Sequence, residues 1–105
     1  MSQIKFNTTY KTKAVEVMAG WDNPLQGYFL SIFKLDLEND DEELLYDNLA
    51  DKDLSSTMGF ARSTGYFKTI LEHFEIVVPD GFWERVERNE RNVTHIFRNE
   101  QWALT

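Results

Sequence analysis

Alternating apolar and polar residues predict the first two strands of the chain. In residues 14–20, Val15 and Val17 fall on one face and Glu16 on the other, which is the period-two pattern of a half-buried strand. Residues 28–37 are rich in β-branched and aromatic side chains, and their length is typical of a central strand with both faces covered. We therefore expect these two strands to form a hairpin.

The connection between these strands contains its own turn signals. Asp22 and Asn23 can hydrogen-bond their own backbone, and Pro24 restricts the residue before it to extended geometry. Gly27 supplies conformational freedom just before the second strand. Trp21 has no such local role. Its indole therefore either closes one end of the core or faces a partner.

Two helices and a last strand are expected in the second half of the chain. Within residues 64–75, apolar residues recur at spacings of three, four and seven, which is the pattern of an amphipathic helix. Pro79 and the strong N-cap residue Asp80 then signal a second helix, supported by acids placed four residues ahead of arginines. Residues 93–98 alternate again and predict the last strand, with a turn at residues 99–100.

The order of these elements predicts the α+β class. Residues 1–13 show no clear period and are expected to be a loosely ordered arm, with room for a short edge strand over residues 4–9. Strands that group apart from helices predict an antiparallel sheet of three to five strands with two helices packed on one face. The length fits a single domain over residues 1–105, in which residues 36–57 form an acidic connection.

The composition narrows the class of protein. A hydrophobic content of 42% is enough for a folded core. Because the chain has no cysteine, it has no disulfide framework, thiolate zinc site or cysteine nucleophile. The first residues lack the apolar stretch of a secretory signal, and the longest apolar run is too short for a membrane helix. We therefore expect a cytoplasmic protein that does not contact the membrane.

Negative charge is concentrated in one segment. Residues 36–53 hold nine acids and one lysine, a net charge of −8, whereas the whole chain carries −7. A field of this sign repels phosphate, so we expect no direct contact with nucleic acid, and it favours basic partners. The acids from Asp36 onward only partly follow the spacing of a calcium-binding loop, because the required glycine and the final glutamate are missing. No metal or cofactor is therefore expected.

The residues that could carry catalysis are few. His73 lies on the predicted first helix between two glutamates, and His95 lies in the predicted last strand. Either could act as a base near neutral pH if the fold supplied a carboxylate partner. No serine stands in a nucleophile elbow, and the acids are too numerous for one pair to be singled out. The sequence therefore provides no catalytic set and favours a protein that is not an enzyme.

These observations favour a protein-interaction, regulatory or inhibitory module whose acidic patch docks on the basic surface of another protein, with Trp21 or Trp83 as apolar anchor. The candidate partner-binding residues are Asp36, Glu38, Asp40, Asp41, Glu42, Glu43, Asp47 and Trp21. An acidic run that only keeps the surface solvated is the simpler reading of the same segment. The alternative function is a small-molecule-binding protein or enzyme with a pocket between sheet and helices, served by one of the histidines. A homodimer formed through a sheet edge or a helix face fits either function.

Overall fold

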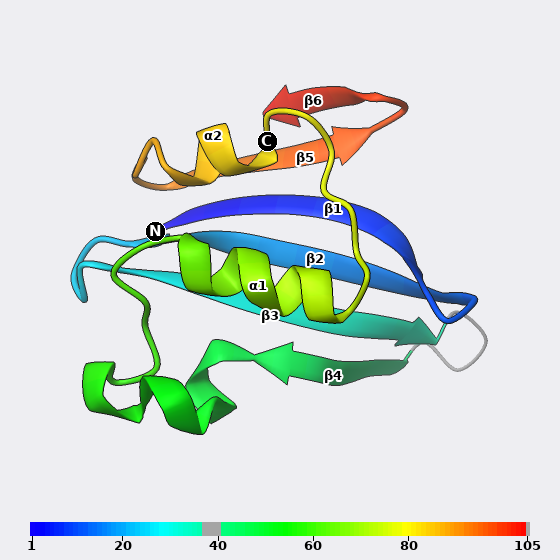
Figure 1. The fold of residues 1–105 in the computed structure, drawn as a ribbon. Coiled ribbons are helices and arrows are strands. Elements are labelled where there is room, and N and C mark those ends of the chain that lie inside the picture. Colours follow the sequence, from blue (N-terminus) through cyan, green and yellow to red (C-terminus); the bar gives the residue numbers. More distant parts are fainter. Residues whose placement is uncertain (37–40, 105) are drawn as a thin grey trace.

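The protein is an α+β structure built on one six-stranded sheet (Figure 1). The computed structural model describes residues 1–36 and 41–104, and for residues 36, 41 and 42 it describes the backbone alone. The strands are β1 (Ser2–Tyr10), β2 (Lys13–Asp22), β3 (Gly27–Asp36), β4 (Asp41–Asp47), β5 (Val93–Arg98) and β6 (Gln101–Leu104). Their order across the sheet is β4-β3-β2-β1-β5-β6. All neighbours are antiparallel except β1 and β5, which are parallel.

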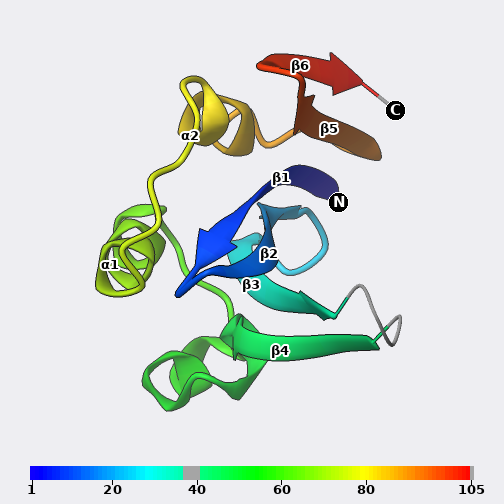
Figure 2. The ribbon, with the colours of Figure 1, turned by 90° about the vertical axis from the view of Figure 1, so that its right-hand side faces the viewer.

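The two α-helices lie on one side of the sheet, as the side view shows (Figure 2), and two 3₁₀ helices follow the edge strand β4 in the chain. They are η1 (Asn48–Ala50), η2 (Lys52–Thr57), α1 (Gly65–His73) and α2 (Phe82–Val86), of which η1 and η2 are 3₁₀ helices. Within the described part of the chain, no α-helix covers the opposite side of the sheet, and the connection after β4, which includes η1, borders it. We call that side the open face and the other side the helix face.

The core lies between the helices and the helix face. Successive side chains of a strand point to opposite sides of a sheet, so the register places residues of neighbouring strands in rows on one face. One such row joins Ile4, Ala19 and Leu30, and another joins Phe6, Val17 and Ile32. The helices cover these rows with fully buried apolar residues: Phe67 from α1, and Phe82 and Val86 from α2. The ring of Phe82 meets that of Phe6 edge to face, with centroids 5.0 Å apart.

The predicted hairpin and the predicted first helix are confirmed. β2 and β3 pair along most of their length, from Val15 opposite Lys34 to Asp22 opposite Gly27. α1 occupies the centre of the segment predicted as an amphipathic helix, and its apolar residues face the sheet. Local periodicity was sufficient here because each element is long enough to show its own pattern.

The prediction of a loosely ordered N-terminal arm is wrong. Ser2–Tyr10 forms the interior strand β1, hydrogen-bonded to β2 on one side and to β5 on the other. A two-residue turn at Lys11 and Thr12, both with positive φ, folds β1 back onto β2. At the far end the Trp21 amide donates to the Ser2 hydroxyl at 3.0 Å, and a Cβ on Gly20 would overlap the Ser2 carbonyl oxygen. The strand approaches so closely there because position 20 is glycine.

The prediction of three to five antiparallel strands is also wrong, because the sheet has six strands and one parallel pair. The strands beyond the three predicted from a clear pattern are β1, β4 and β6, and β4 lies in the segment predicted as an acidic connection. The sequence indicated at most a short edge strand at β1. Pairing with neighbouring strands, more than their own composition, holds these segments extended.

The start of the second helix differs from the prediction as well. Its N-cap is Gly81, which has a left-handed backbone and no side-chain capping bond. The Asp80 carbonyl instead accepts a hydrogen bond from the Trp102 indole at 2.9 Å. Asp80 therefore connects α2 to β6 and does not cap the helix.

Candidate functional site

The open face carries an apolar groove over β2, β3 and the connection after β4. Phe29 and Phe33 of β3 point to this face, and Met18 of β2 lies beside them. The groove has a volume of about 280 Å³ and is lined by Met1, Gln3, Met18, Phe29, Ser31, Asp47, Asn48, Leu49 and Phe60. Phe29 and Ser31 form its floor and are only 6% and 7% exposed, although neither α-helix lies on this face.

Exposed apolar side chains surround this groove. Leu49 of η1 and Met1 belong to its lining and are 65% and 46% exposed. Leu44 of β4 is 47% exposed and pairs with Phe33, two positions beyond Ser31 on the same face. Single exposed apolar residues are common on any protein, but a contiguous group of them marks a surface that binds something. We call the group Met1, Met18, Phe29, Phe33, Leu44 and Leu49 the open-face patch.

The sequence-predicted acidic residues are only partly described. Glu38 and Asp40 lie outside the described residues, as do the side chains of Asp36, Asp41 and Glu42. The backbones of these last three residues belong to β3 and β4, next to the open-face patch. The described acidic residues of β4 (Asp41–Asp47) therefore lie along one edge of the sheet.

The two acids of β4 whose side chains are described point to opposite faces. Asp47 lines the groove, where its carboxylate accepts from the Leu49 amide at 3.3 Å and from the Ser31 hydroxyl at 3.4 Å. Glu43 points to the helix face and lies 3.6 Å from the Lys34 ammonium. The carboxylate of Glu43 is 69% exposed, and such surface ion pairs contribute little to stability. Asp47 is thus the acidic candidate that the described structure brings to the groove.

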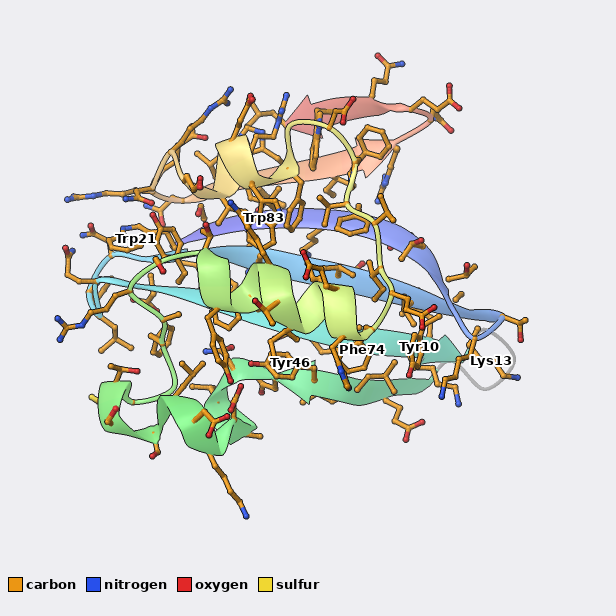
Figure 3. The ribbon with its side chains drawn as sticks, viewed as in Figure 1. Tyr10, Lys13, Trp21, Tyr46, Phe74 and Trp83 are labelled. Carbon is orange, nitrogen blue, oxygen red and sulfur yellow. The ribbon has the colours of Figure 1, made fainter. Side chains whose placement is uncertain are left out.

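The two tryptophans proposed as apolar anchors, Trp21 and Trp83, are labelled in Figure 3, and neither belongs to the lining of the groove. The half-buried ring of Trp21 packs against the core on the helix face, with its centroid 4.9 Å from that of Tyr28. Trp83 of α2 meets Phe82 edge to face at 4.8 Å, and the Lys68 ammonium lies 5.7 Å from its centroid. Sequence reasoning missed the open-face patch because Leu44 and Leu49 lie within the acidic run, where nothing local shows which face of the sheet they occupy. Their position next to β3 was the missing information.

A hydrogen-bonded cluster fixes the connection that carries Leu49. The Asp51 carboxylate accepts from the Tyr46 hydroxyl at 2.6 Å, from the Tyr66 hydroxyl at 2.7 Å and from the Asp53 amide at 3.0 Å. Tyr46 belongs to β4 and Tyr66 to α1, so one carboxylate ties the 3₁₀ segment to both elements. We call Asp51, Tyr46 and Tyr66 the tyrosine clasp. It holds the rim of the groove in place.

The tyrosine clasp shifts the pKa values of its members in opposite directions. Burial tends to raise the pKa of Asp51, but the hydrogen bonds from Tyr46 and Tyr66 outweigh it and the pKa is lowered. The hydrogen bond to Asp51, together with burial, raises the pKa of Tyr66 to about 12. Burial and the same carboxylate also raise the pKa of Tyr46. The clasp therefore consists of a carboxylate and two neutral phenols at neutral pH.

The two histidines have different surroundings. His95 is 5% exposed, and its Nε2 lies 3.0 Å from a carboxylate oxygen of Glu90. His73 lines a second cavity of about 450 Å³ where the end of α1 meets the β1–β2 hairpin, together with Thr9, Tyr10, Lys11, Phe74 and Glu75. Neither the hydrogen bonds nor the ion pairs of the described residues connect the two histidines.

Among the described residues, no group of three or more histidine and acidic side chains could hold a metal ion. Of the helices in residues 1–36 and 41–104, none is long and apolar enough to cross a membrane. No family model matches the chain, and no curated protein or solved structure does. The function must therefore be inferred from the surfaces described above.

Proposed function

We propose that this protein is a non-enzymatic interaction module whose open-face patch binds a basic partner protein. The single observation that carries this proposal is an apolar groove with exposed leucines beside an edge strand of strongly acidic sequence. Interfaces of this kind combine an apolar centre with a charged rim. In this arrangement the acidic segment attracts the partner, and the open-face patch, in place of Trp21, is the apolar anchor.

The apolar residues supply the affinity in this arrangement. Fully burying a leucine side chain contributes about 1.5–3 kcal/mol. Because Leu44 and Leu49 are 47% and 65% exposed, covering each of them contributes roughly 1–2 kcal/mol. The groove between Met18, Phe29 and Leu49 can receive one apolar side chain of the partner, which is the usual form of an interface hot spot.

The charges supply the direction and the choice of partner. Residues 36–53 carry a net charge of −8, so the partner is expected to present lysines and arginines around its apolar contact residue. Asp47, on the groove itself, is positioned to meet the nearest of them. Attraction between exposed charges is screened by salt, so binding should weaken as ionic strength rises.

The proposal is tested with three lysine variants and a partner captured from the native host. Leu44→Lys and Leu49→Lys place a charge in the open-face patch, whereas Val77→Lys places the same charge at an 86% exposed valine outside it. Captured proteins are identified by mass spectrometry, purified and titrated against each variant by calorimetry. A basic protein should bind the wild type and the Val77→Lys control alike and should bind the two patch variants at least about tenfold more weakly, a change of about 1.4 kcal/mol.

Two results would contradict the proposal. One is that no basic protein binds the purified wild type at low salt. The other is a partner whose affinity is the same for Leu44→Lys, Leu49→Lys and the Val77→Lys control, since the contact would then lie elsewhere on the molecule.

A second candidate function, binding of a small molecule, is favoured by the cavity at His73. Its volume of about 450 Å³ falls within the range of ligand sites, and Tyr10 and Phe74 provide aromatic walls. It ranks second because its polar side chains, Lys11, His73 and Glu75, are exposed to solvent. A thermal-shift screen of metabolites against the wild type and His73→Ala tests it. A ligand of this cavity should stabilise the wild type and lose its effect in the variant.

A further inference from the structure

The two edges of the sheet differ in how they are protected. β4 has an acidic sequence, and its pairing with β3 shifts register between Ile32 and Phe33. Charges and bulges of this kind prevent an edge strand from pairing with another chain. β6, at the opposite edge, has the uncharged sequence Gln-Trp-Ala-Leu, without proline and with continuous pairing to β5. β6 is therefore the edge that can accept another strand.

The hairpin geometry shows which backbone groups of β6 face outward. Arg98 pairs with Gln101 across a two-residue turn whose residues, Asn99 and Glu100, have φ values of 51° and 62°. In such a hairpin the two residues that flank the turn exchange hydrogen bonds, and hydrogen-bonded pairs then alternate with non-hydrogen-bonded pairs. The amide and carbonyl groups of Gln101 and Ala103 thus face β5, and those of Trp102 and Leu104 face outward.

We propose that two copies of the chain associate by antiparallel pairing of β6 with β6, about a two-fold axis that passes next to Ala103. Trp102 of each copy then lies opposite Leu104 of the other and exchanges backbone hydrogen bonds with it. The two sheets become one continuous sheet. This inference does not depend on the basic partner proposed above, because β6 and the acidic edge β4 are at opposite ends of the sheet.

The side chains of β6 suit this pairing. Trp102 is held in place by its hydrogen bond to the Asp80 carbonyl and by the Arg85 guanidinium, which lies 4.5 Å from its ring centroid. Leu104 is 68% exposed and would cover part of the indole of the opposite copy. Aromatic and aliphatic residues paired across strands stabilise a sheet. Ala103 lies at the axis, where its small exposed side chain lets the two strands approach.

The distribution of charge also favours a second copy as the occupant. Each chain carries a net charge of −7, and a segment of net charge −8 includes the β4 edge. Pairing through β6 places the two acidic segments at the two distant ends of the joined sheet, where their repulsion is weakest. Pairing of β6 with β4 would instead be head to tail and would not close, and the bulge and acids of β4 oppose it.

Substitution of Ala103 by charged residues tests this axis. Ala103 of one copy lies directly opposite Ala103 of the other, with Cα atoms about 4.5 Å apart in a non-hydrogen-bonded pair. Ala103→Lys alone and Ala103→Glu alone each place like charges at that distance, so each variant is expected to be monomeric. An equimolar mixture places opposite charges there, and a heterodimer is expected. The wild type should show a monomer–dimer equilibrium in sedimentation and native mass spectrometry over a wide concentration series.

A proline variant tests the backbone hydrogen bonds separately. The Leu104 amide faces away from β5, so Leu104→Pro removes an outward donor and leaves the β5–β6 ladder intact. Leu104→Val keeps the donor and serves as the matched control. Leu104→Pro should be monomeric and Leu104→Val dimeric, with the thermal unfolding of the Ala103 and Leu104 variants confirming that each is folded. The proposal is overturned if the wild type stays monomeric, if Ala103→Lys remains a dimer, or if the charged mixture forms no heterodimer.

Discussion

The tyrosine clasp gives the sharpest test of how the acidic segment is organised. Tyr66→Phe removes one hydroxyl and leaves the ring, so it deletes the 2.7 Å hydrogen bond to Asp51 without opening a cavity. Hydrogen bonds to a charged group contribute about 1.5–3 kcal/mol. Because Tyr66 and Asp51 are half-buried, we expect the lower end of that range, a loss of about 1.5 kcal/mol in the free energy of unfolding. Tyr46→Phe, which deletes the 2.6 Å bond, should cost about as much.

A double-mutant cycle separates this bond from other effects of the missing hydroxyl. Urea unfolding followed by circular dichroism gives the free energy of unfolding for the wild type, Tyr66→Phe, Asp51→Asn and the double variant. If the hydroxyl acts through the carboxylate, Tyr66→Phe should cost well under about 1 kcal/mol once Asp51 is an amide. Equal costs in the two backgrounds would refute the reasoning, because the Tyr66 hydroxyl would then act independently of Asp51.

Two further predictions concern pH and the core. The pKa of Asp51 is lowered in the folded protein, so its contribution to the free energy of unfolding is present above the ordinary aspartate pKa of about 3.9 and is lost as the pH falls through the lower value of the folded state. The difference in stability between wild type and Asp51→Asn should therefore be constant near neutral pH and shrink in acid. Urea titrations at each pH measure this difference. A gap that widened in acid would contradict this sign. Ile4→Ala should lower the free energy of unfolding by about 2–5 kcal/mol, because Ile4 is fully buried in an interior strand. A loss below about 0.5 kcal/mol in chemical denaturation would instead indicate the loose arm that the sequence alone favours.

The elements that could be predicted from sequence are those with a strong local pattern. The β2–β3 hairpin and α1 show their periodicities within a dozen residues, and both are where the pattern places them. β1 could not be recognised in this way because its short apolar alternation, Ile4 and Phe6, becomes meaningful only when β2 and β5 pair on either side of it. Long-range pairing leaves no trace in the composition of the segment itself.

In the candidate site, too, the sequence predicted local features but not the contacts between distant residues. The sequence identified the acidic segment, but a count of charges does not say which acids serve the fold. Asp47 caps η1 and Asp51 holds two tyrosines, and both functions depend on residues that the chain brings together only on folding. The open-face patch was missed for the same reason, since Leu44 is next to Phe33 only across a strand pair.

The parallel pairing of β1 with β5 has a consequence for the order in which this chain can fold. β1 is synthesised well before β5, because β2, β3, β4, α1 and α2 lie between them in the chain, and among the described strands this pair joins the two halves of the sheet. Contacts between such distant segments must overcome the entropy of closing a long loop, which slows folding. Until β5 is synthesised, one side of β1 is an unsatisfied row of amides and carbonyls. The nascent chain is therefore exposed to mispairing at this side of β1 throughout the synthesis of the segments between the two strands.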